Sequence, residues 1–180
     1  MTGPADLPRS PSPADVADLT ARVLAQARRL RLTIAVAESL TGGQLAAAFT
    51  AVPGASAVFR GSVTAYATDL KASVLGVDSV LLASSGAVHP EVARQMADGV
   101  RRLCGADLGL ATTGVAGPEP QDGRPVGTVY VALSGQGLAE TEQNDFAAPP
   151  DPDASDRARI QLASVFAVLQ LTHRHLGMRT

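Results

Sequence analysis

The stretch from Ala35 to Gly43 constrains the fold most, because an apolar run passes through a serine and a threonine into a Gly-Gly pair. The apolar residues within 32–37 predict a buried strand, and the alanine-rich residues 44–50 favour a helix. Ser39 therefore lies at a predicted strand-to-helix crossover. In an α/β protein such a crossover stands at the carboxyl end of a strand, where ligands bind.

Ser39 is a candidate acyl-transfer nucleophile at this crossover. We expect the free N–H groups of the following helix turn to face a developing oxyanion. Gly42 and Gly43 would let a substrate approach the backbone without interference from a Cβ atom. The alternative is that Ser39 or Thr41 only caps the helix. Residues elsewhere in the chain bear on this choice.

Composition sets the class of protein. With 180 residues, 46% of them hydrophobic and 18% charged, we expect one globular domain. A net charge of −2 gives little attraction for a polyphosphate backbone, so we expect a small-molecule substrate and no nucleic-acid partner. Cys104 is the only cysteine, which excludes an internal disulfide and a zinc site built from cysteines. No signal peptide or membrane-spanning run is visible, so we expect no membrane association and a cytoplasmic location.

The order of elements predicts an α/β fold. Residues 1–13, with four prolines, are expected to form a flexible tail, and residues 14–180 a single domain. Strands are predicted at 62–66, 108–111, 126–133 and 138–146, and helices are predicted to begin near residues 14, 69, 90 and 155. Residues 78–82 are expected to form one more helical turn. This alternation indicates a three-layer α/β/α sandwich with a mixed, mostly parallel sheet, because the last two strands form an antiparallel hairpin.

A serine nucleophile needs a proton acceptor, and two kinds of residue are available. Among the three histidines, His173 and His175 lie near the end of the last helix and suit a surface position. His89 precedes Pro90 and either caps a helix or lines a pocket. Lys71 is the only lysine beside fourteen arginines, which suggests a need for a cation that can lose its proton, although a surface charge is the alternative.

With these residues assembled, the chain resembles the CinA C-terminal domain family. The resemblance rests on Ala37-Glu38-Ser39-Leu40-Thr41-Gly42-Gly43, on Tyr66 with Lys71 five residues later, and on Gly86-Ala87-Val88. It continues through Thr113-Gly114-Val115-Ala116-Gly117-Pro118, Pro125-Val126-Gly127-Thr128-Val129 and Asp156-Arg157. The similarity covers residues 14–176. Larger members of the family carry an additional molybdopterin-binding-like domain, and this chain resembles the stand-alone form.

The enzymatic members of this family are nicotinamide-nucleotide amidases, so the resemblance implies hydrolysis of nicotinamide mononucleotide to nicotinate mononucleotide and ammonia. It implies that Ser39 is the nucleophile and that Lys71 and Tyr66 transfer its proton. No cofactor or metal is implied, and no cluster of metal ligands at the usual spacing is visible. The expected substrate-binding residues are Thr41, Gly42, Gly43, Thr113, Gly114, Gly117 and Arg157.

Two departures from the family pattern are visible. His89 stands where a serine is common, and Pro120-Gln121-Asp122 with Arg124 replaces a Gly-Gly pair and a later lysine. The second departure predicts a different loop between residues 119 and 124. The alternative function is a non-catalytic module that binds nucleotides or proteins in a competence or damage response. Another amide or ester hydrolase is a further possibility, and small domains of this kind often form symmetric homodimers.

Overall fold

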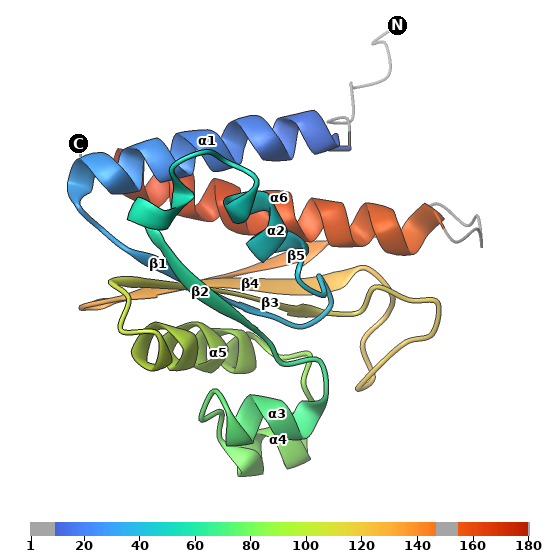
Figure 1. The fold of residues 1–180 in the computed structure, drawn as a ribbon. Coiled ribbons are helices and arrows are strands. Elements are labelled where there is room, and N and C mark those ends of the chain that lie inside the picture. Colours follow the sequence, from blue (N-terminus) through green and yellow to red (C-terminus); the bar gives the residue numbers. More distant parts are fainter. Residues whose placement is uncertain (1–9, 147–154, 180) are drawn as a thin grey trace, which may run out of the picture.

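A computed structural model describes residues 10–146 and 155–179 (Figure 1). The described chain folds into helices and strands in the following order: α1 (Pro13–Leu30), β1 (Ile34–Glu38), α2 (Gln44–Thr50), η1 (Ala55–Ala57), β2 (Phe59–Thr64), α3 (Thr68–Ser73), α4 (Ser79–Ser85), α5 (Pro90–Leu103), β3 (Leu108–Gly114), β4 (Thr128–Gly135), β5 (Leu138–Asp145) and α6 (Ser155–Gly177).

The strands form one mixed sheet in the order β2-β1-β3-β4-β5. β1 pairs in parallel with β2 and β3, whereas β3 with β4 and β4 with β5 are antiparallel. Four of the five described strands therefore run in one direction, and β4 runs against them. This arrangement confirms the predicted mixed sheet with a late hairpin. In register, Glu38 stands between Thr64 and Thr112, so β1, β2 and β3 reach the same edge together.

Helices cover both faces of the sheet, as a three-layer sandwich requires (Figure 1). α1, α2 and α6 lie on one face, and α5 with the α3–α4 segment lies on the other. The side chains of β1 alternate between two cores: Ile34 and Val36 pack toward α1 and α6, whereas Ala35 and Ala37 pack toward α5. The small residues on the α5 face let that helix come close to the sheet.

Some element boundaries differ from the prediction for local reasons. α1 begins at Pro13, within the predicted start at residue 13 or 14, because Ser12 and Asp15 form a capping box around its first turn. Pro13 therefore belongs to the helix, and residues 1–9 of the predicted tail lie outside the described residues. β2 covers Phe59–Thr64 rather than residues 62–66, because its pairing with β1 already begins at Phe59, which stands opposite Ile34. Within the described residues, no helix is long and apolar enough to cross a membrane.

Two glycines allow the close approach of α5. A Cβ atom at Gly109 of β3 would lie 2.0 Å from the carbonyl oxygen of Ala97. A Cβ atom at Gly99 of α5 would lie 1.9 Å from the carbonyl oxygen of Leu75, just beyond α3. Gly99 therefore lets α5 hold the segment that carries Lys71.

We predict that Gly99→Ala destabilises the protein by about 2 kcal/mol, because overpacking outweighs the gain in helix propensity of about 1 kcal/mol. The measurement is the free energy of unfolding by urea. Gly177→Ala in α6 is the control, since its Cβ atom meets only the Gln26 side chain at 3.8 Å. The control should match or exceed the wild-type stability. A Gly99→Ala protein as stable as the control would contradict the packing argument.

Candidate functional site

The candidate site is a cleft at the edge where β1, β2 and β3 end together. It has a volume of about 90 Å³. The lining residues come from the loops after β1, β2 and β3 and from the start of α6: Ser39, Leu40, Tyr66, Gly114, Val115, Ala116, Gly117, Glu119, Gln121 and Arg157. Of the residues predicted from sequence, the fold thus brings Ser39, Tyr66, Gly114, Gly117 and Arg157 to one cleft.

Ser39 is held in place through its backbone. Its N–H group donates to the carbonyl oxygen of Thr112 over 3.0 Å, which extends the β1–β3 pairing by one residue. The residue is 9% exposed and lines the cleft. Within the described part of the chain its hydroxyl has no hydrogen-bond partner. The hydroxyl is therefore free to meet a ligand, and it caps no helix.

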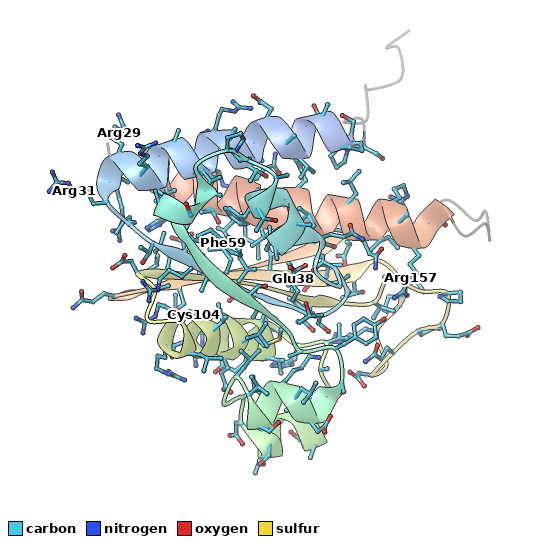
Figure 2. All side chains as sticks on the ribbon, viewed as in Figure 1. Arg29, Arg31, Glu38, Phe59, Cys104 and Arg157 are labelled. Carbon is cyan, nitrogen blue, oxygen red and sulfur yellow. The ribbon has the colours of Figure 1, made fainter. Side chains whose placement is uncertain are left out.

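Glu38 is a residue of the site region that sequence reasoning missed. It is fully buried between α2 and the sheet (Figure 2). Its carboxylate accepts the N–H groups of Gly43 and Leu45 at 3.0 Å and of Ala46 at 2.8 Å. The negative charge thus compensates the positive N-terminal end of α2. An acid at the end of an apolar strand, four residues before a Gly-Gly pair, was the available signal.

This arrangement corrects the expected position of the oxyanion-binding groups. The N–H group of Gly43 donates to Glu38, and that of Gly42 donates to the carbonyl oxygen of Ser39 over 3.1 Å. Neither N–H group is available to a ligand. The N–H groups of Leu40 and Thr41 have no acceptor among the described residues. Leu40 directly follows the serine and lines the cleft, so its N–H group replaces those of the glycines as the candidate donor.

Four of the predicted substrate-binding residues do not line the cleft but support the loops around it: Thr41, Gly42, Gly43 and Thr113. Gly42 and Gly43 have φ values of 60° and 102°, which favour glycine and allow the chain to reverse into α2. Thr41 is buried, and its Oγ1 lies 2.8 Å from Oγ1 of Thr112 on β3. Thr113 is also buried and donates to the carbonyl oxygen of Ala87 over 2.8 Å. Both threonines therefore fix the loops around the cleft from behind.

Arg157 connects three segments at the rim of the cleft (Figure 2). Its Nη1 donates to the carbonyl oxygen of Gly117 over 2.6 Å, and its Nη2 donates to the hydroxyl of Tyr66 over 2.7 Å. The Tyr66 side chain is otherwise open to solvent, with the residue 58% exposed. Since its oxygen accepts from the arginine, its own proton is available for donation. A guanidinium carries five N–H groups, so Arg157 keeps donors for an anion.

Lys71 is buried rather than on the surface, at 1% exposure. Its Nζ donates to the carbonyl oxygens of Ala65 over 2.8 Å and Tyr66 over 3.3 Å. Burial lowers the pKa of Lys71 from 10.5 to about 8, although the charges of Asp122 and Asp69 act to raise it. Lys71 does not line the cleft, and no hydrogen bond joins it to Ser39. It lies behind the turn that presents Tyr66.

The histidines have other partners. His89 is the N-cap of α5, and its Nδ1 accepts the N–H group of Glu91 over 3.2 Å. The Nδ1 atom of His173 lies 2.7 Å from Oε1 of Gln26, and that of His175 lies 3.0 Å from Oε1 of Glu140. His89 was expected either to cap a helix or to line a pocket, and the structure shows the helix cap. Within residues 10–146 and 155–179, no group of three or more potential metal ligands is present.

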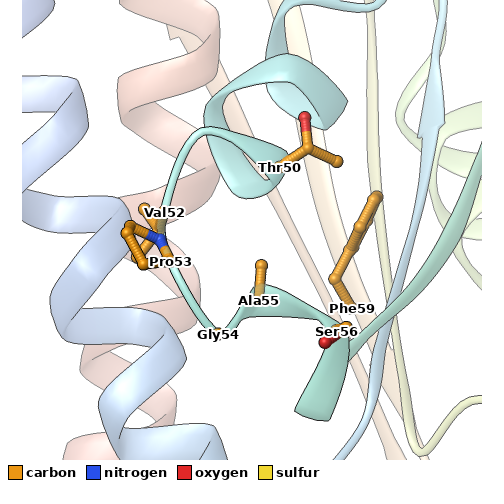
Figure 3. A pocket seen from close by; sticks show the side chains of 7 residues that line it. All are labelled: Thr50, Val52, Pro53, Gly54, Ala55, Ser56 and Phe59. Carbon is orange, nitrogen blue, oxygen red and sulfur yellow. The ribbon is translucent and has the colours of Figure 1, made fainter.

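A larger cavity of about 400 Å³ lies elsewhere, between the end of α2 and the start of β2 (Figure 3). Its lining includes Val52, Pro53 and Phe59, and its polar side chains are the hydroxyls of Thr50 and Ser56. No titratable side chain lines it. The smaller cleft therefore remains the candidate site, because it combines a free hydroxyl, a phenol and a guanidinium.

We predict that Glu38→Gln destabilises the protein by about 2 kcal/mol, because the side-chain amide would face N–H groups that then lack an acceptor. The measurement is the free energy of unfolding in urea at neutral pH. Glu119→Gln makes the same chemical change at an exposed position and should leave that free energy nearly unchanged. Equal stability of the two variants would show that α2 does not depend on the buried carboxylate.

Comparisons with known proteins agree with this architecture. The family model described as CinA C-terminal domain matches residues 16–176. A CinA-like protein of Frankia casuarinae is 51% identical over 145 residues, which cover 81% of this chain and 32% of that protein. A putative competence-damage inducible protein of Geobacillus is 50% identical over 122 residues, 68% of this chain and 29% of that protein. The chain thus spans about a third of the length of these relatives.

Solved structures match over nearly their whole length. The competence damage-inducible protein A of Klebsiella pneumoniae has a TM-score of 0.84 and 32% identity, covering 92% of this chain and 99% of that one. The competence/damage inducible protein of Agrobacterium tumefaciens has a TM-score of 0.83 and 32% identity, covering 94% and 99%. Sequence, fold and motif order lead to one conclusion: the chain belongs to the CinA C-terminal domain family.

Proposed function

We propose that the cleft hydrolyses the carboxamide of nicotinamide mononucleotide, giving nicotinate mononucleotide and ammonia. The observation that carries this proposal is the free Ser39 hydroxyl in a cleft backed by the only lysine of the chain, whose pKa is lowered to about 8. An amide demands both a nucleophile and a group that protonates the departing nitrogen. Ser39 supplies the first, and Lys71 with Tyr66 supplies the second.

The hydrogen bonds of Lys71 suit a base. A neutral amine has two N–H groups, which match the two carbonyl oxygens of Ala65 and Tyr66. Its lone pair then remains free to accept a proton. In the proposed reaction this proton comes from Ser39 by way of the Tyr66 hydroxyl, as the serine oxygen bonds to the carboxamide carbon. The same route returns the proton to the nitrogen as ammonia leaves, and water then hydrolyses the acyl-serine.

Charge that develops on the carboxamide oxygen requires N–H donors. The unpaired N–H group of Leu40, next to the nucleophile, is the proposed donor, and such a donor contributes roughly 3–4 kcal/mol in comparable sites. The phosphate is proposed to bind at Arg157 and at the N–H groups of Ala116 and Gly117, which line the cleft and have no acceptor among the described residues. A volume of about 90 Å³ suits the carboxamide end, with the ribose phosphate lying across the rim.

One observation favours the alternative of a non-catalytic nucleotide-binding module. The cleft, at about 90 Å³, lies below the roughly 300–1,000 Å³ typical of small-ligand pockets. A module that only binds the nucleotide would bind it equally well with or without the serine hydroxyl, and no ammonia would form.

We predict that the wild-type protein releases ammonia from nicotinamide mononucleotide and that Ser39→Ala reduces this rate at least 10³-fold, because the variant lacks the hydroxyl that attacks the carboxamide. Ammonia release and nucleotide binding are both measured. Ser56→Ala, in the larger cavity, is the control and should keep the wild-type rate. Binding without turnover by the wild type would support the non-catalytic alternative, and a fully active Ser39→Ala protein would exclude Ser39 as the nucleophile.

We further predict that kcat/KM rises about tenfold per pH unit below pH 8 and levels off above it, because Lys71 must be neutral to accept the proton. Lys71→Arg should lose nearly all turnover while still binding the nucleotide, since a guanidinium keeps its proton. The measurements are kcat/KM for ammonia release from pH 6 to 10 and the affinity of Lys71→Arg for the nucleotide by calorimetry. A Lys71→Arg protein that keeps most of the wild-type rate would mean that another group is the base.

A further inference from the structure

The loop that departs from the family pattern forms a tight turn with Asp122 at its tip. Gln121 and Arg124 pair across the turn. The N–H group of Gln121 donates to the carbonyl oxygen of Arg124 over 3.1 Å, and that of Arg124 donates to the carbonyl oxygen of Gln121 over 2.8 Å. Asp122 and Gly123 between them have φ values of 51° and 70°. Two consecutive positive φ values are typical of the turn that Asp-Gly favours. The turn therefore presents the Asp122 side chain in a defined direction.

The Asp122 carboxylate docks on the segment before α5. Its Oδ2 accepts the N–H groups of Ala87 over 2.7 Å and Val88 over 3.3 Å. Gly86 leaves room for it, because a Cβ atom there would lie 2.3 Å from the carboxyl carbon of Asp122. Two hydrogen bonds and a steric fit thus fasten the loop to a segment 35 residues away in the sequence.

Both partners of this contact belong to the surroundings of the cleft. The loop contributes Glu119 and Gln121 to the lining. On the other side, the carbonyl oxygen of Ala87 accepts the Thr113 hydroxyl at 2.8 Å, so the docking segment is itself tied to β3. A change at Asp122 would therefore loosen one wall of the cleft while leaving Ser39 in place.

We propose that Asp122 is a positioning residue that fastens the 119–124 loop, and with it one wall of the cleft, to the Gly86–Val88 segment. The charged groups that act on Lys71 are Asp122 from the loop and Asp69 from α3, and Asp122 has the larger influence of the two. Both stabilise the ammonium, which opposes the effect of burial. Removal of the Asp122 charge should therefore lower the pKa of Lys71 further.

Because Lys71 is the only lysine, its protonation can be followed without any substrate. Protein labelled with ¹³C- and ¹⁵N-lysine gives one side-chain signal, whose pH titration by NMR reports the charge of Lys71 directly. Asp122→Asn keeps an oxygen that can accept from Ala87 but removes the charge, and we expect it to move the titration midpoint down by about half a pH unit or more. Asp69→Asn should move it in the same direction by less.

Glu119→Gln is the matched control in the same loop, because Glu119 is not among the charges that shift the pKa of Lys71 and the hydrogen bonds to Ala87 and Val88 come from Asp122. It should leave the Lys71 midpoint unchanged. Asp122→Ala removes both the charge and the hydrogen bonds, and we expect the same downward movement together with faster exchange of the Ala87 amide hydrogen with solvent. A midpoint in Asp122→Asn equal to that of Glu119→Gln would overturn the electrostatic role. Unchanged Ala87 exchange in Asp122→Ala would overturn the fastening.

The kinetic consequence rests on the proposed function and is tested separately. In Asp122→Asn the acidic limb of the kcat/KM profile should move to lower pH by the same amount as the NMR midpoint. In Asp122→Ala the KM for nicotinamide mononucleotide should rise several-fold as well, because the loop wall is no longer fastened. A moved NMR midpoint in a protein that never releases ammonia would overturn the proposed function alone. Normal turnover with an unmoved midpoint, an unchanged KM and unchanged Ala87 exchange would overturn the role of Asp122 alone.

Discussion

The site depends first on a buried negative charge, the carboxylate of Glu38 at the end of the central strand. An ionised group is costly to bury unless hydrogen bonds replace its water, and here three backbone N–H groups do so. Those same N–H groups would otherwise be unpaired at the start of α2. The same hydrogen bonds thus solvate the carboxylate and give the N–H groups at the start of α2 an acceptor. They also fix the turn so that Ser39, the next residue, faces the cleft.

Lys71 depends on a second constraint, the close packing of α5. Small residues on one face of the sheet, among them Ala35, Gly109 and Ala111, bring that helix close to the strands. Gly99 then allows contact with the backbone at Leu75, just after α3. The helix that carries Lys71 is thereby held against the end of β2, where the lysine loses most of its water. Burial at this position is what lowers the pKa of Lys71.

Much of this arrangement could be predicted from sequence, and the exceptions have physical reasons. The crossover at Ser39 and the mixed sheet follow from apolar runs and turn residues, which are local signals. The position of Thr41 did not follow, because its partner Thr112 is 71 residues away. The engagement of the Gly43 N–H group was not predicted either, because the sequence places Glu38 at the end of an apolar strand but does not show which backbone groups its carboxylate accepts. The role of Asp122 likewise depends on a distant segment.

Position 71 suits a lysine better than the arginine that the chain uses elsewhere. The pocket behind Tyr66 offers two carbonyl oxygens, which suit the two N–H groups of a neutral amine. An arginine would bring five N–H groups and a charge that it cannot lose, so several donors would stay buried without acceptors. Burial favours the neutral lysine, whereas Asp122 and Asp69 favour the ammonium. Because these effects oppose each other, the pKa lies near 8 rather than far lower, and the lysine can both accept and return a proton near neutral pH.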